Sequence, residues 1–146
     1  MIVADTNVVS ELMRAEPDGR VLAWAEGLAP GAVAITVITV EEIERGLARL
    51  PDGRRRRDLT ASWRQTLGAH LDDVLVYDST AARATAAILV DQEKAGRGMG
   101  LADAQIAGIC VSRGWPLATR NTKDFAEVRD LVVLDPFRPE GAAVSR

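Results

Sequence analysis

The chain has 146 residues, of which 47% are apolar and 27% charged, an ordinary composition for one globular domain. It contains no apolar run near the roughly 18 residues that cross a membrane, and Asp5 and Glu11 interrupt any signal-peptide core. The formal net charge of −3 argues against a surface that grips nucleic acid over its whole extent. We expect one domain over residues 1–137 with a frayed tail over 138–146, located in the cytoplasm and independent of membranes.

Short apolar, β-branched runs alternate along the chain with helical patterns. The predicted elements, in chain order, are strand 2–4, helices 8–13 and 19–28, strand 32–37, helices 40–50 and 54–71, strand 74–77, helices 79–95 and 102–113, strand 116–119, helix 121–127 and strand 131–134. Strands that alternate with helices form a parallel sheet covered on both faces. The predicted fold class is therefore α/β, with a central, mainly parallel five-stranded sheet.

The N-terminal strand ends abruptly at three polar residues, Asp5, Thr6 and Asn7, all of which favour helix caps and turns. In a sheet covered by helices, ligands bind in the crevice beyond the carboxyl ends of the strands. We therefore expect Asp5 to be held by a buried strand and to point into that crevice.

Four acids share one context, the junction between a strand and a helix or the start of a helix: Asp5, Glu42, Asp103 and Asp124. Each also has a structural explanation. Asp5 can cap a helix, and Asp103 lies in a first helical turn, where the helix dipole favours an anion. Thr39 and Glu42 fit a capping box, and the stretch 121–124 is another cap-like sequence.

Taken together, these acids favour a metal site. Residues just beyond several parallel strands converge at one edge of the sheet, and neighbouring carboxylates repel one another unless a cation lies among them. An oxygen-only donor set suits Mg²⁺ or Mn²⁺. We expect Asp5, Glu42 and Asp103 to hold the metal and Asp124 to assist, with Thr6 and Asn7 orienting the ligands by hydrogen bonds.

The rest of the composition narrows the chemistry to metal-activated water attacking a phosphodiester. His70 is the only histidine and is interpreted as structural or exposed, so a Ser-His or Cys-His nucleophile is not expected. Cys110, the only cysteine, lies between Ile109 and Val111 in a helix and is interpreted as a buried, inert thiol.

Arginines make up most of the positive charge, and four of them are consecutive: Arg54, Arg55, Arg56 and Arg57. This run either begins a solvated helix or lies along an RNA backbone, where arginine makes bidentate phosphate contacts. Arg120, one residue before Asn121, is a further candidate RNA contact.

Four segments resemble the PIN-domain ribonucleases, in particular the VapC/FitB-like toxins of bacterial toxin–antitoxin pairs. They are Ile-Val-Ala-Asp-Thr-Asn-Val-Val-Ser-Glu-Leu (2–12), Ile-Thr-Val-Glu-Glu-Ile-Glu-Arg-Gly (38–46), Leu-Ala-Asp-Ala-Gln-Ile-Ala (101–107) and Leu-Ala-Thr-Arg-Asn-Thr-Lys-Asp-Phe (117–125). The resemblance implies a three-layer α/β/α sandwich, Mg²⁺- or Mn²⁺-dependent cleavage of RNA, and a homodimer. It also implies inhibition by a cognate antitoxin whose C-terminal segment enters the active-site groove.

The resemblance places the family's metal-binding acids on Asp5, Glu42, Asp103 and Asp124 of this sequence. Members often carry an acid where this chain has Asn121, so one-metal and two-metal mechanisms both stay open. Two alternatives compete with the nuclease hypothesis. One is a phosphatase or phosphotransferase with an aspartyl nucleophile, although Asn7 stands where that chemistry usually needs a general acid. The other is a non-catalytic module that binds Mg²⁺.

Overall fold

The computed structural model describes residues 1–70 and 74–138 of the chain, without the side chain of His70. Its strands are β1 (Ile2–Ala4), β2 (Val33–Thr36), β3 (Val74–Leu75), β4 (Leu117–Ala118) and β5 (Val133–Leu134). Its helices are α1 (Thr6–Leu12), α2 (Gly19–Glu26), α3 (Val37–Arg49), α4 (Arg54–His70), α5 (Ser79–Lys94), α6 (Leu101–Arg113) and α7 (Thr122–Phe125). Of the expected tail only Arg138 is described, so the tail stays a prediction, as does the interpretation of the His70 side chain.

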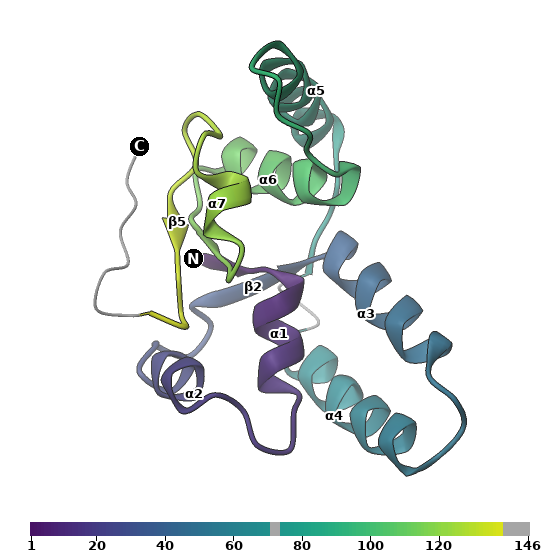
Figure 1. Cartoon of the computed structure of the whole chain (residues 1–146). Coiled ribbons are helices and arrows are strands. Elements are labelled where there is room, and N and C mark those ends of the chain that lie inside the picture. The colour runs from purple at the N-terminus through teal and green to yellow at the C-terminus, as the bar shows by residue number, and fades with distance from the viewer. Residues whose placement is uncertain (71–73, 139–146) are drawn as a thin grey trace.

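All four strand pairings are parallel, and the strand order is β3-β2-β1-β4-β5. Helices cover both faces of the sheet, with α5 and α6 on one side and α1 and α2 on the other (Figure 1). The predicted three-layer α/β/α sandwich is confirmed. Among the described residues, no helix is long and apolar enough to span a membrane.

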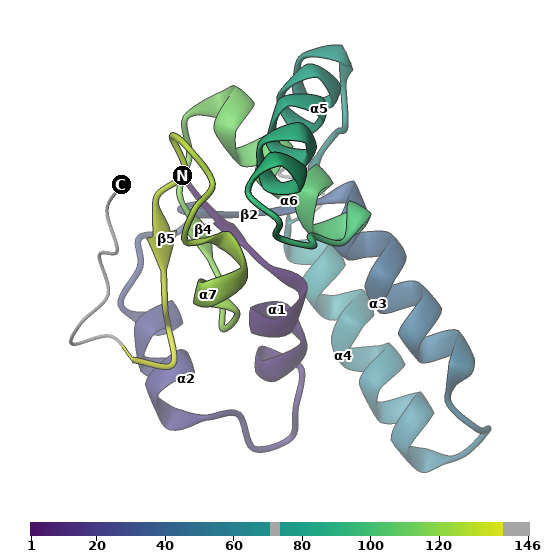
Figure 2. The same ribbon diagram turned by 45° about the horizontal axis from the view of Figure 1, so that its top comes forward.

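Successive residues of β1 point to opposite faces of the sheet and belong to separate cores, as the two-residue period of a strand requires. Val3 packs with α5, α6 and Phe125 of α7, whereas Ala4 packs with α1, α2, α3 and Trp63 of α4. Helices α3 and α4 contact each other and project together from the sheet (Figure 2). A strand buried on both faces explains why 2–4 is apolar throughout.

The strand order changes direction at β1, because β2 and β3 follow on one side and β4 and β5 on the other. In open α/β sheets, such a switch point leaves a crevice at the carboxyl ends of the two diverging strands. Asp5 follows β1 directly, and Thr119 follows β4 directly. The sheet therefore presents both side chains at its crevice.

The predicted start of the third helix is wrong. The helix expected over 40–50 begins three residues earlier, at Val37, and its N-cap is Thr36, whose hydroxyl accepts a hydrogen bond from the Thr39 amide. The capping box between Thr39 and Glu42 therefore does not form. Glu42 instead lies in the second turn of α3, where its carboxylate is available for other contacts.

Candidate active site

Asp5 is buried at the carboxyl end of β1, with 3% of its surface exposed, and three donors hold its side chain. Its Oδ1 accepts from the Thr6 amide at 2.8 Å, so the residue does cap α1. Its Oδ2 accepts from the Thr119 hydroxyl at 2.7 Å and from Asn7 Nδ2 at 3.1 Å. Burial raises the pKa of Asp5 above its ordinary value, and these three hydrogen bonds oppose the rise.

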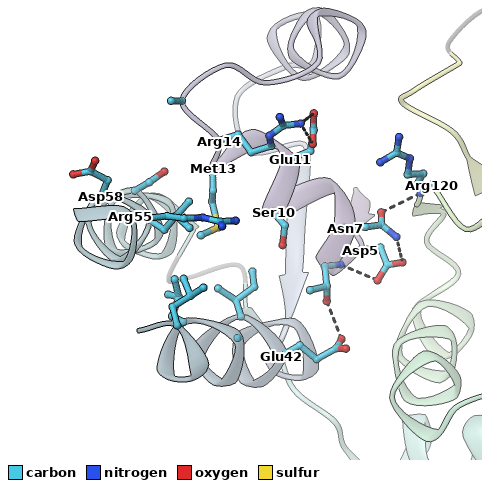
Figure 3. A pocket seen from close by; sticks show the side chains of 18 of the residues that line it. Asp5, Asn7, Ser10, Glu11, Met13, Arg14, Glu42, Arg55, Asp58 and Arg120 are labelled. Atoms are coloured by element: carbon cyan, nitrogen blue, oxygen red, sulfur yellow. Dashed lines mark hydrogen bonds and ion pairs between the residues drawn. The ribbon is translucent and has the colours of Figure 1, made fainter. Parts of the chain in front are cut away.

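Asn7 fixes the neighbouring loop to Asp5. Its Nδ2 also donates to the Thr119 hydroxyl at 3.2 Å, and its Oδ1 accepts from the Arg120 amide at 3.0 Å. Figure 3 shows Asn7 between Asp5 and Arg120. The supporting role predicted for Asn7 therefore has a structural basis, since one amide orients the acid and anchors the segment after β4.

A chain of hydroxyls leads to Glu42. The Thr6 hydroxyl donates to Glu42 Oε1 at 2.9 Å and lies 3.1 Å from the Thr39 hydroxyl. Each hydroxyl has one proton, so Thr39 must be the donor to Thr6. Thr36 in turn donates to Thr39 at 3.4 Å. The last proton of the chain points at the Glu42 carboxylate and orients it toward α1 (Figure 3).

Asp103 is half-buried in the first turn of α6 and makes no side-chain hydrogen bond to any described residue. Its pKa is raised from 3.8 to about 6, first by burial and then by the negative charges of Asp5, Glu42 and Asp124. The structure thus brings Asp5, Glu42 and Asp124 within electrostatic reach of Asp103.

Asp5, Glu42 and Asp103 line one groove of about 1480 Å³, whereas Asp124 lines an adjoining pocket. Asn121 lies between the two and lines both, but its side chain does not cap α7, contrary to the cap-like interpretation. Within the described parts of the chain, no three acidic, histidine or cysteine side chains are arranged closely enough to hold an ion by themselves.

The groove runs from the acids toward the projecting helices. Its middle is lined by apolar side chains of α3 and α4. Figure 3 shows Arg55 and Asp58 at the end away from Asp5, and Arg54, which precedes Arg55 at the start of α4, also lines the groove. Arg120 borders the acidic end. Of the other predicted RNA contacts, Arg56 pairs with Asp52 at 2.8 Å and, like Arg57, does not line the groove.

Two residues of this site, Thr119 and Glu11, are not predicted by the sequence patterns. Thr119 is fully buried and binds Asp5, but its importance depends on β4 lying next to β1, which no local pattern reveals. Glu11 lines the groove, and its pKa is lowered by the Asp18 amide and by Arg14. Cys110 is buried as expected, and burial raises the pKa of its thiol, consistent with an inert side chain.

The chain that builds this site also matches a known protein family. A model of the PIN domain matches residues 2–131, a span that includes all four acids. The chain is a PIN-domain protein. This assignment confirms the resemblance found in the four sequence segments.

The most informative relatives of this PIN-domain chain match it over nearly their whole length. It is 39% identical over 140 residues to VapC ribonuclease Y4jK of Sinorhizobium fredii, covering 95% of this chain and 99% of the relative. It is 33% identical to Toxin FitB of Neisseria gonorrhoeae, covering 94% and 99%. The crystal structure of FitAcB from that organism superposes with a TM-score of 0.85 at 33% identity, covering 94% of this chain and 99% of the other.

The raised pKa of Asp103 predicts a distinctive pH dependence of stability. Because the folded chain holds this proton up to about pH 6 and the unfolded chain only to about pH 3.8, the group's contribution to the free energy of unfolding falls between those values as pH rises. Asp103→Asn should match the wild type at the acid end of that window. At pH 7 it should be more stable, by about 1 kcal/mol once solvent screening is allowed for.

Urea denaturation in EDTA at a series of pH values measures this difference. Asp91→Asn, which removes an exposed acid from α5, is the matched control and should show no such step. If the difference in free energy of unfolding between Asp103→Asn and the wild type stays constant across the window, the raised pKa of Asp103 is contradicted.

Proposed function

We propose that this chain is an endoribonuclease that hydrolyses RNA phosphodiesters with the help of Mg²⁺ or Mn²⁺. We further propose that it is the toxin of a toxin–antitoxin pair, acting in the cytoplasm as a homodimer and inhibited by a cognate antitoxin. The observation that carries the proposal is the convergence of four acids at the crevice of the sheet, where burial, and then the charges of Asp5, Glu42 and Asp124, raise the pKa of Asp103. Relatives named as a VapC ribonuclease and a toxin support the substrate and the biological role.

The donor set of the crevice fits a hard divalent cation. Every candidate ligand is a carboxylate, burial and then the neighbouring negative charges raise the pKa of Asp103, and Asp103 makes no competing hydrogen bond with a described residue. Mg²⁺ usually takes one or two carboxylates and keeps several waters, so such a site needs only two carboxylates from the chain. Asp5 and Asp103 are the side chains we assign to direct contact, with Glu42 and Asp124 alongside.

When bound, a divalent cation would supply Lewis acidity toward the phosphate and would favour deprotonation of water. The chain's own contribution is to hold the ligands in place. Thr119 and Asn7 fix Asp5, and Thr6 fixes Glu42, so little reorganisation is needed when an ion and a substrate arrive. We assign to Glu42 and Asp124, whose negative charges both act on Asp103, the role of accepting a proton from water.

The hydrogen bonds of Asp5 and Asn7 favour hydrolysis by water over an aspartyl-phosphate mechanism. Both Asp5 oxygens already accept hydrogen bonds, which lowers their nucleophilicity. Asn7, two residues after Asp5, already uses its amide in contacts with Asp5, Thr119 and the Arg120 amide. Its amide protons are not acidic enough to protonate a leaving group.

The groove also supports the proposed inhibition. Its acidic end would attract a cationic side chain, its apolar middle would accept apolar side chains, and its far end carries Arg54 and Arg55. A partner segment with complementary charges could fill this groove and displace both RNA and metal. FitB, at 33% identity, is named a toxin, and the FitAcB structure shares its fold with this chain over 94% of the length.

The central test is RNA cleavage by the purified chain with Mg²⁺ and with EDTA. We expect metal-dependent cleavage that Asp5→Asn lowers by at least about 100-fold, the upper end of what losing even an outer-shell partner costs. Asp91→Asn should cleave like the wild type. Equal cleavage in EDTA, or full activity of Asp5→Asn, would refute the proposal.

The hydroxyl chain predicts a separate effect at Thr6. Thr6→Val removes the donor to Glu42 and should lower kcat by about 10-fold, whereas Thr6→Ser keeps the hydroxyl and should retain most of the activity. Single-turnover cleavage measures both variants. If Thr6→Ser is as impaired as Thr6→Val, the methyl group matters more than the hydrogen bond and the positioning role is wrong.

A further inference from the structure

A second pocket of about 470 Å³ adjoins the acidic end of the groove. Its walls come from the start of α2, the segment after β4, helix α7 and the segment after β5. Four cationic side chains line it, namely Arg20, Arg120, Lys123 and Arg138, against two acids, Asp124 and Asp135. Its charge balance is therefore opposite to that of the neighbouring acid cluster.

Several of these cations are not neutralised by the pocket itself. Arg20 pairs with Asp18 at 2.7 Å, but the described residues provide no ion pair for Lys123 or Arg138. Asp135 is committed to the turn after β5, since its Oδ1 accepts from the Phe137 amide and its carbonyl from the Arg138 amide. This turn fixes the backbone that presents Arg138.

Arg120 and Asn121 line both the pocket and the groove and so form the boundary between them. The guanidinium of Arg120 lies over the ring of Phe137, 4.5 Å from the ring centre, and its own backbone amide binds Asn7 beside Asp5. Phe137 is 4% exposed, so it supports the guanidinium from below while Arg120 itself is exposed. An arginine plane held in this way can stack with a nucleic-acid base.

We propose that this pocket binds one nucleotide of the RNA next to the cleaved phosphodiester, with Lys123 and Arg138 contacting its phosphate and Arg120 stacking on its base. The inference rests on the proposed function and deepens it by naming a substrate subsite. An RNA strand that passes Asn121 on its way out of the acidic centre enters the pocket directly. The pocket therefore determines which of the two nucleotides that flank the cleaved bond is held. The acids repel phosphates without metal, and the adjoining cations offset that repulsion.

The test uses the full chain carrying Asp5→Asn and a fluorescein-labelled single-stranded RNA of about 12 nucleotides, a length within the range of single-strand sites. Lys123→Ala with Arg138→Ala should lower affinity about tenfold and reduce the slope of log K against log salt by about 0.7, since both side chains contact one phosphate and each neutralised phosphate contributes about 0.7. The matched control is Arg83→Ala with Lys94→Ala, an exposed arginine and lysine on α5 outside both pockets.

A series of probes with one methylphosphonate each then locates the contact. Neutralising one phosphate should weaken binding to the Asp5→Asn chain but have no further effect once Lys123 and Arg138 are alanine. The inference is overturned if the pocket variant matches the α5 control, or if every phosphate remains equally important in both chains. Failure of the wild type to cleave RNA would defeat the proposed function instead, and this binding comparison would still decide the pocket.

Discussion

The hydrogen bond from the Thr119 hydroxyl to Asp5 joins the ends of two neighbouring parallel strands at the switch point of the sheet. Ala4 pairs in register with Ala118, so the next residue of each strand emerges at the same edge, one an acid and the other its donor. Both are buried, which makes the bond strong and its geometry fixed. The Asn7 side chain donates to both members of this pair, and its Oδ1 accepts from the backbone amide of Arg120 in the segment after β4.

Because these hydrogen bonds hold Asp5 in place, the acids around it lower the stability of the folded chain when no cation is bound. Asp103 adds a fourth acid to a region that already holds Asp5, Glu42 and Asp124, and its pKa rises to about 6, first because it is half-buried and then because of their negative charges. Uncompensated acids destabilise the folded chain, as functional sites often do. In the proposed function the same repulsion would become an affinity for a divalent cation, so the instability and the proposed activity would have one origin.

Much of the fold could be predicted because buried strands and helix caps are local features. The apolar run before Asp5 and the alternation of strands with helices were sufficient for the α/β sandwich. The order of the strands could not be predicted, since periodicity reports burial and not neighbours, and Thr119 was missed for that reason. The start of α3 was misplaced because Val37 and Ile38 are β-branched and extend the strand pattern, although Thr36 provides the cap.

Calorimetric titration of Mn²⁺ into the purified chain at pH 7 measures whether the acids at this crevice share a divalent cation. We expect saturable Mn²⁺ binding that is lost in Asp5→Asn and strongly weakened in Asp103→Asn, while Asp91→Asn binds like the wild type. Mn²⁺ binding that is absent from the wild type, or unchanged when Asp5 becomes asparagine, would contradict this expectation.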